Sequence, residues 1–215
     1  MSDLVMETRD LSDFNQVSLS GVGHLMIEPG DQESVRVEAK AELLPDIVTK
    51  VKGGRLDIRL KPRAGSRRWF EPIGPINYYV TVKDLDTISV SGAGKVTGSR
   101  LCADHLDLRI SGAAKAKLDV TVTELDTRIS GAGNLRLAGK ATRQELTISG
   151  AGKYSAQELS SREGTITISG SGKSTVDVSE RLDVKISGCG RVEWLGDPEI
   201  SKRITGVGKI CRYQG

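Results

Sequence analysis

Six basic residues recur along the chain from residue 95 onward, each at the end of a short glycine-containing motif. They are Lys95, Lys115, Lys153, Lys173, Arg191 and Lys209. Asn134 takes the same place in one copy, and His24 ends an earlier copy. If the motifs stack, these side chains form one positively charged row, which predicts a binding surface for an extended polyanion such as an anionic glycan or another envelope component. The alternative is a solvated edge that blocks sideways aggregation.

Residue types that carry out catalysis or bind metals do not occur in the required patterns. The Ser and Thr residues that open the motifs have no His or Lys base at a fixed spacing, so we expect a hydrogen-bonded ladder rather than nucleophiles. The aspartates in and before the strands are more typical of charge balance than of a glycosidase carboxylate pair. Two histidines, His24 and His105, and three cysteines lack ligand spacing, so we expect no metal, no cofactor and no disulfide framework.

A second candidate surface lies in the segment 62–75, which we expect to be a long exposed loop. Its candidate binding residues are the adjacent basic and aromatic residues Arg67, Arg68, Trp69 and Phe70. The aromatic side chains are suited to stacking on a sugar or inserting into a partner. They are equally suited to forming a small core for the loop itself, and both interpretations stay open.

The motif that positions the basic residues is a hydroxyl residue, Gly, a small residue, usually a second Gly, and usually a base. Its first glycine is present in all eight copies, at Gly21, Gly92, Gly112, Gly131, Gly150, Gly170, Gly188 and Gly206. From Gly92 onward these glycines are 18 to 20 residues apart. A fixed period of this kind indicates one supersecondary unit stacked on copies of itself.

Apolar and polar residues alternate between the motifs, as in 106–110 and 125–129, which is typical of a strand with one face inward. We interpret each unit as strand, glycine corner, strand and a polar return such as 139–145 or 158–164. Such short units bury a core only by stacking, so the sequence predicts an all-β parallel β-helix or β-solenoid with coils of about 18–20 residues. At the corners we expect glycine to supply both a positive φ and close approach between coils.

The N-terminal part departs from this period, because Gly92 lies 71 positions after Gly21. We expect strands at 34–39 and 76–82, a short helix at 42–48, and a hairpin at 51–60 around its two adjacent glycines. This insert is expected to widen or cap the first coils. The domain prediction is therefore one β-solenoid domain over 1–215, with an irregular N-terminal part at 25–84 and regular repeats at 85–215.

Composition and charge limit the remaining classes of function. A net charge of +3 is too mild to indicate nucleic-acid binding. No apolar run is long enough for a transmembrane segment. The first residues, 1–7, lack a basic stretch followed by an apolar run, so we expect no signal peptide in the chain as given.

The order of several segments carries a resemblance to a known family. These segments are Thr8–Val17, Ser18–Gly23, Ile27–Asp31, Leu43–Pro45, the hairpin Val51–Leu60 and the serial Ser-Gly-Ala-Gly-Lys corners. Together they resemble the putative auto-transporter adhesin head GIN domain family, a domain of unknown function, over essentially the whole chain. The resemblance implies a right-handed β-helix and an exported protein that is extracytoplasmic, in the periplasm, at the outer membrane or on the cell surface. It implies no catalytic residues.

The function predicted from these observations is a noncatalytic β-solenoid of the cell envelope, an adhesin or a module that binds glycans or envelope components. Two alternatives remain at this point. Polysaccharide-active enzymes also use β-helices, which is an argument from fold alone. A bactofilin-like structural polymer would grow end to end, and a homo-oligomer is compatible with either interpretation.

Overall fold

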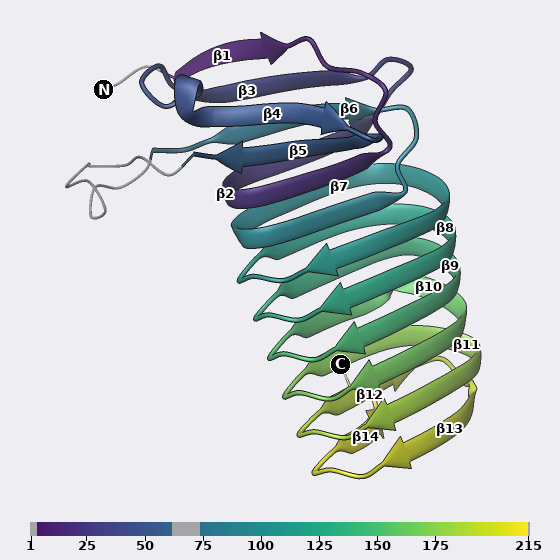
Figure 1. Ribbon diagram of the computed structural model, residues 1–215. Helices are drawn as coiled ribbons and strands as arrows, with labels where there is room; N and C mark the ends of the chain where they lie inside the picture. Colours follow the sequence, from purple (N-terminus) through teal and green to yellow (C-terminus); the bar gives the residue numbers. More distant parts are fainter. Residues whose placement is uncertain (1–3, 62–73, 215) are drawn as a thin grey trace.

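The protein is a stack of parallel β coils with an irregular N-terminal end, as the computed structural model shows for residues 4–61 and 74–214 (Figure 1). Coils of about 19 residues repeat for about six turns, which confirms the predicted β-solenoid. Arg67, Arg68, Trp69 and Phe70 lie outside the described residues, so the second candidate surface stays a prediction.

Each coil is made by one long strand that bends around the stack. These strands are β2 (Gln16–Pro29), β7 (Thr87–Ile110), β8 (Lys115–Ile129), β9 (Asn134–Ile148), β10 (Lys153–Ile168) and β11 (Lys173–Ile186). They pair in parallel in this order, and the final coil is divided into β12 (Arg191–Leu195), β13 (Glu199–Ile204) and β14 (Lys209–Arg212). Because pairing is in parallel, residues at equivalent positions of successive units become rows along the stack.

The prediction of polar returns between strands is wrong. Residues 139–145 lie within β9, and residues 158–164 lie within β10, where both are paired with neighbouring coils. Their backbone groups find partners in the coils on either side, so the backbone stays extended, and most of the polar side chains point outward while Gln144 and Ser161 are buried. The pairing of β10 is interrupted only by short register shifts, between Ser155 and Glu158 against β9 and between Ala156 and Ser160 and between Ser161 and Glu163 against β11.

The N-terminal segment extends both faces of the first coil. On one face β6 (Asn77–Val82) pairs in parallel with β2, and β3 (Ser34–Lys40) and β1 (Leu4–Arg9) follow in antiparallel order. On the other face, the predicted hairpin is confirmed as β4 (Ile47–Lys52) and β5 (Arg55–Leu60), with β5 paired to β2. Gly53 and Gly54 both adopt a positive φ, as a two-residue hairpin turn requires.

The helix predicted at 42–48 is wrong in extent. Only Leu44–Asp46 forms a short 3-10 helix, η1, and Ile47 is already extended. Pro45 lies in the first turn of η1 and lacks an N–H, while Ile47 enters β4 with its side chain buried. The pairing of β4 with β5 therefore ends the helix after one turn.

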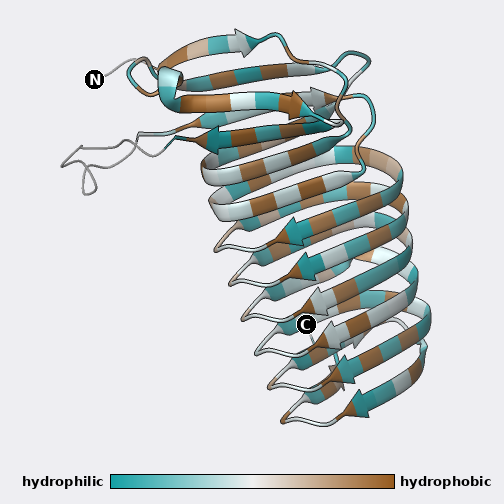
Figure 2. Ribbon diagram, in the orientation of Figure 1, coloured by the Kyte–Doolittle hydropathy of each residue, from teal (hydrophilic) through white to brown (hydrophobic). Residues whose placement is uncertain are grey.

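The core is one continuous column of apolar side chains between the faces, and inward and outward residues alternate along each strand (Figure 2). One row consists of Ile110, Ile129, Ile148, Ile168 and Ile186, all at most 3% exposed. Ile204 continues this row in the last coil but is 37% exposed. The column is therefore covered at the N-terminal end and open at the C-terminal end.

The corner glycines serve close approach rather than backbone conformation in the regular coils. A Cβ on Gly131 would overlap the carbonyl oxygen of Gly112 in the preceding coil, and the same holds for the first glycine of each regular corner. A Cβ on the second glycine, Gly152, would lie 2.6 Å from Cγ2 of Ile129. A positive φ occurs only at the earliest corner, at Gly21 and Gly23, so the predicted need for positive φ is wrong for the later ones.

Candidate functional site: the basic row

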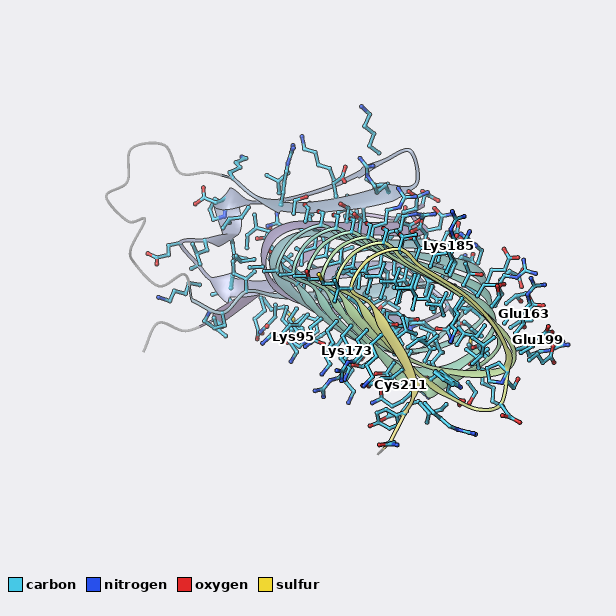
Figure 3. The ribbon with its side chains drawn as sticks, turned by 90° about the horizontal axis from the view of Figure 1, so that it is seen from below. Lys95, Glu163, Lys173, Lys185, Glu199 and Cys211 are labelled. Atoms are coloured by element: carbon cyan, nitrogen blue, oxygen red, sulfur yellow. The ribbon has the colours of Figure 1, made fainter. Side chains whose placement is uncertain are left out.

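The strand pairing places the recurring bases directly above one another. In order along the stack, the row contains Lys95, Lys115, Asn134, Lys153, Lys173, Arg191 and Lys209, here called the basic row. His24 precedes Lys95 in the same register on β2. Viewed along the stack, Lys95 and Lys173 lie on one flank of the coil, away from Glu163 and Glu199 (Figure 3). Neighbouring coils are about 4.8 Å apart, so the row is a dense line of positive charge.

Part of the basic row is neutralised by a single carboxylate. Glu193 lies 2.9 Å from Nζ of Lys173 and 3.6 Å from Arg191. The hydrogen bond from Lys173 is the main reason that the pKa of Glu193 lies below its ordinary value. Within residues 4–61 and 74–214, Lys95, Lys115, Lys153 and Lys209 form no ion pair, so most of the row keeps its full charge.

His24 adds no fixed charge to the row at neutral pH. Its Nε2 lies 2.8 Å from the hydroxyl of Thr97. Partial burial, and then the positive charge of Lys95, lower the pKa of His24 below 6.5. The neutral imidazole therefore ends the row as a polar group.

The opposite edge of the coil carries a second row with a different pattern of charge. Its members are His105, Glu124, Arg143, Glu163, Arg181 and Glu199, here called the alternating row. Arg143 lies 3.1 Å from Glu163 and 3.7 Å from Glu124. His105 lies 3.7 Å from Glu124 and 3.8 Å from Asp126. This row is compensated within the protein.

Two aspartates of the strands, Asp107 and Asp183, balance the charge of neighbouring bases, as predicted. Asp107 is 6% exposed and accepts hydrogen bonds from the guanidinium groups of Arg109 and Arg128. Asp183 accepts a hydrogen bond of 3.0 Å from Arg181. Because these carboxylates are held by arginines on their own and neighbouring coils, the geometry matches ion pairing rather than a pair of carboxylates flanking a scissile bond.

The predicted hydroxyl ladder is limited to one step. Ser91 donates a 3.0 Å hydrogen bond to Ser20, but the later hydroxyls of this row, from Ser111 to Thr205, do not bond one another in the described structure. Backbone bonds between coils hold the corner instead, as in the 2.9 Å bond from the Ser130 N–H to the Ile110 carbonyl. The corner therefore does not depend on a continuous chain of side-chain bonds.

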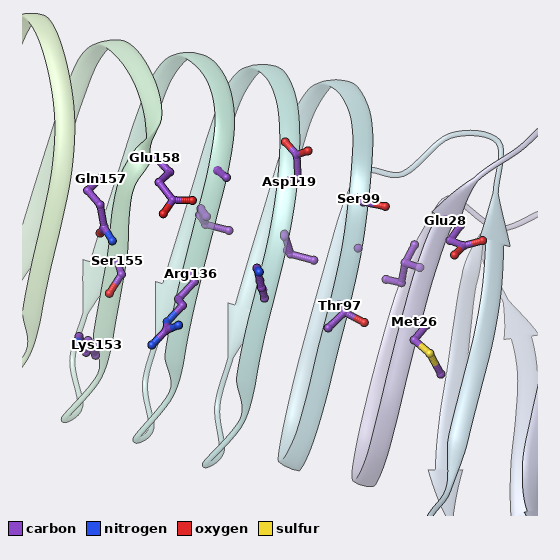
Figure 4. Close-up of a pocket in the computed structure, with 16 residues that line it drawn as sticks. Met26, Glu28, Thr97, Ser99, Asp119, Arg136, Lys153, Ser155, Gln157 and Glu158 are labelled. Carbon is purple, nitrogen blue, oxygen red and sulfur yellow. The ribbon is translucent and has the colours of Figure 1, made fainter.

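A groove beside the basic row was not predicted. It has a volume of about 860 Å³ and is lined by residues of β2, β7, β8, β9 and β10, of which most are charged or polar and some, such as Met26 and Ala138, are apolar (Figure 4). Lys117 and Arg136 belong to it, each two residues after a member of the basic row and on the same outward face. The alternation of inward and outward residues could have indicated this groove. In these two coils, the outward position two residues after the motif carries a second base.

Other kinds of site find no support in the residues that the structure describes. No cluster of three or more His, Cys, Asp or Glu residues suited to a metal ion occurs among them. Cys102, Cys189 and Cys211 are all free thiols. None of the described helical segments is long and apolar enough to span a membrane.

Comparison with known proteins places the chain by both sequence and structure. A family model described as "Putative auto-transporter adhesin, head GIN domain" matches residues 13–198. None of the curated proteins compared with the chain matches it.

Several solved structures share the whole fold. A putative adhesin from Bacteroides fragilis has a TM-score of 0.91 at 22% identity, with 99% of this chain and 98% of that one covered. A putative adhesin from Parabacteroides distasonis has a TM-score of 0.77 at 20% identity, with 99% and 98% covered. A putative lipid binding protein from the same species has a TM-score of 0.76 at 21% identity, with 99% and 97% covered. At these identities the likeness concerns the fold.

Proposed function

The chain belongs to the putative auto-transporter adhesin, head GIN domain family, and from that membership we propose that it is a noncatalytic, extracytoplasmic β-solenoid that binds an anionic glycan or another anionic envelope component. The basic row is the proposed binding surface. The description of the family and of its structural relatives as adhesins supports binding outside the cytoplasm. Nothing in these comparisons favours a polysaccharide-active enzyme or an end-to-end polymer.

The observation that carries this proposal is the contrast in compensation between the two rows. On the alternating row, bases such as Arg143 have carboxylates on the coils to either side. On the basic row, Lys95, Lys115 and Lys153 have no such partner in the described parts of the chain. Stacked like charges repel, and an anionic polymer lying along the row would relieve that repulsion while releasing its own counterions.

The test is a double charge reversal, Lys115→Glu with Lys153→Glu, measured on an array of anionic polysaccharides over a range of salt concentrations. We expect affinity to fall at least about tenfold, and the dependence of affinity on salt to become shallower. The matched control is Lys140→Glu with Lys185→Glu, which makes the same change in net charge at exposed positions outside the row. Equal binding by the test variant and the wild type would contradict the proposal.

A further inference from the structure

The groove beside the basic row has two walls of opposite charge. Its charged lining residues are Lys117, Arg136 and Lys153 on one side and Glu28, Asp119 and Glu158 on the other. Figure 4 shows Lys153 and Arg136 near the glycine corners, whereas Asp119, Glu158 and Glu28 lie farther along the coils. The groove therefore presents bases and acids to the same occupant.

The two walls do not neutralise each other. Within residues 4–61 and 74–214, none of these six side chains forms an ion pair or a side-chain hydrogen bond. Elsewhere on these coils, opposite charges do meet, as in the 3.1 Å pair of Arg143 with Glu163. Lys117 and Asp119 form no such pair, although they occupy neighbouring outward positions of β8. The bases and the acids therefore both stay open to an occupant that lies across the strands.

The groove also presents neutral polar groups suited to hydroxyl groups, and two of them are in register with Lys117 and Arg136. Thr97, Ser99, Ser155 and Gln157 line it with donors and acceptors. A carboxylate such as Asp119 accepts strong, charge-assisted hydrogen bonds from hydroxyl groups, whereas it repels phosphate or another carboxylate. The acidic wall thus selects against an occupant that carries negative charge all around its backbone.

The spacing along the groove matches a polymer of sugar rings. Lys117 and Arg136 are register partners on adjacent coils, so their charges repeat at roughly 4.8 Å, and Lys153 follows on the next coil but two residues nearer the corner, in register with Asn134. This step is close to the length of one hexopyranose unit in an extended polysaccharide. A polyphosphate chain places its charges more densely and offers no hydroxyl groups to the acidic wall.

We infer that the groove binds an acidic polysaccharide of the uronate type. The ligand's carboxylates face Lys117, Arg136 and Lys153, and its ring hydroxyls donate hydrogen bonds to Glu28, Asp119 and Glu158. This inference rests on the proposed function, because the same chain would lie beside the basic row. It adds that the acidic wall contributes to binding and sets the class of ligand.

The experiment removes the acidic wall without changing shape, through the double variant Asp119→Asn with Glu158→Gln. Polygalacturonate and polyphosphate of matched chain length are the probes, and binding is measured by calorimetry. We expect the variant to bind polygalacturonate about tenfold more weakly, since two charge-assisted hydrogen bonds are lost. Polyphosphate binding is expected to become tighter, because a repulsion is removed. The control, Asp104→Asn with Glu145→Gln, makes the same charge change at exposed positions off the groove.

The outcomes separate this inference from the proposed function. If the acidic-wall variant binds both polymers more tightly, the wall only repels and the inference is wrong, while the basic row still binds polyanions. Wild-type protein that prefers polyphosphate would also overturn the inference. If the wild type binds neither polymer, the proposed function itself fails. Thermal unfolding of both variants checks that the coils stay intact.

Discussion

The basic row and the alternating row are built by the same coils at the same spacing, yet they treat charge in opposite ways. On the alternating row each charge has an opposite neighbour, so Glu124, Arg143 and Glu163 satisfy one another along the stack. On the basic row the nearest neighbours of Lys95 are His24 and Lys115. The repeat itself therefore does not force like charges to lie side by side. Of these two rows, only the basic row places bases next to one another without opposite charges between them.

The two rows also differ in how the backbone holds them. The basic row directly follows the glycine corner, where the backbone of one coil lies against that of the next. The members of the alternating row lie at outward positions within continuous strands such as β10, where Glu163 comes directly after a register shift that begins at Ser161. Register shifts also follow the basic row, between Gly98 and Leu101 and between Ser155 and Glu158, so the rows differ in the close backbone contact at the corner and not in the regularity of the pairing.

The largest expected effect comes from breaking the corner that aligns the basic row, with Gly131→Val. Its side chain would overlap the backbone of Gly112, which cannot move without displacing the coil before it. Overpacking against side chains costs roughly 1–3 kcal/mol, and overpacking against backbone should reach the upper end or exceed it. We expect a loss of about 3 kcal/mol or more in the free energy of unfolding, measured by urea titration.

The matched control lies at the adjacent residue. Ala132→Val ends in the same side chain, adding two methyl groups where Gly131→Val adds a Cβ as well, at an exposed position that Val22 and Val207 occupy in other copies of the motif. We expect a change within about 0.5 kcal/mol. Equal destabilisation by both variants would mean that close approach at the first glycine does not determine the stack.

The coils and the rows can be predicted from the sequence because two regularities are visible in the residue types. One is the motif period of about 19 residues, and the other is the alternation of apolar and polar residues along the strands. The basic row follows from these two regularities alone. The polar returns were missed because outward polar side chains look the same in a loop and in a paired strand. Only the backbone pairing of 139–145 with neighbouring coils distinguishes them.

The groove and the buried polar residues depend on register, which one sequence does not reveal. Gln144 is fully buried in a row that holds Leu106 and Leu125 in earlier coils. It accepts a 3.1 Å hydrogen bond from Tyr154 and donates one of 2.6 Å to Ser161. Nothing in the local pattern indicates that these three side chains meet, since they come together only when β9 and β10 stack.

A smaller effect is expected from making the alternating row resemble the basic row, with Glu163→Lys. Three bases would then follow one another, because Arg143 and Arg181 lie on the coils to either side. These side chains are largely exposed, so solvent screening limits the loss to below about 1 kcal/mol. Urea unfolding at low and high salt measures it, and the loss should shrink as salt is added. A loss that is independent of salt would indicate packing rather than charge.

The reverse change, Lys153→Glu, should make the basic row resemble the alternating row. We expect it to raise the free energy of unfolding, whereas Glu163→Lys lowers it. A carboxylate at this position meets Lys173 on the next coil and Asn134 on the previous one. We expect a gain of up to about 0.5 kcal/mol in the free energy of unfolding at low salt, lost at high salt. Destabilisation comparable to that of Glu163→Lys would show that the basic row carries no repulsion.

The smallest effect concerns Glu193, the one carboxylate that pairs with members of the basic row in the described structure. Because the hydrogen bond from Lys173 lowers the pKa of Glu193 below its ordinary value of 4.5, its ionised form stabilises the fold at neutral pH, and this contribution is lost as pH falls through the lowered pKa. Glu193→Gln should therefore cost a few tenths of a kcal/mol at pH 7 and progressively less below pH 4.5. Urea midpoints across this range measure the difference, with Glu145→Gln as a control lacking an ion pair in the described chain. If the cost persists at low pH, shape or packing at Glu193 sets it, and the local compensation of the basic row contributes nothing measurable to stability.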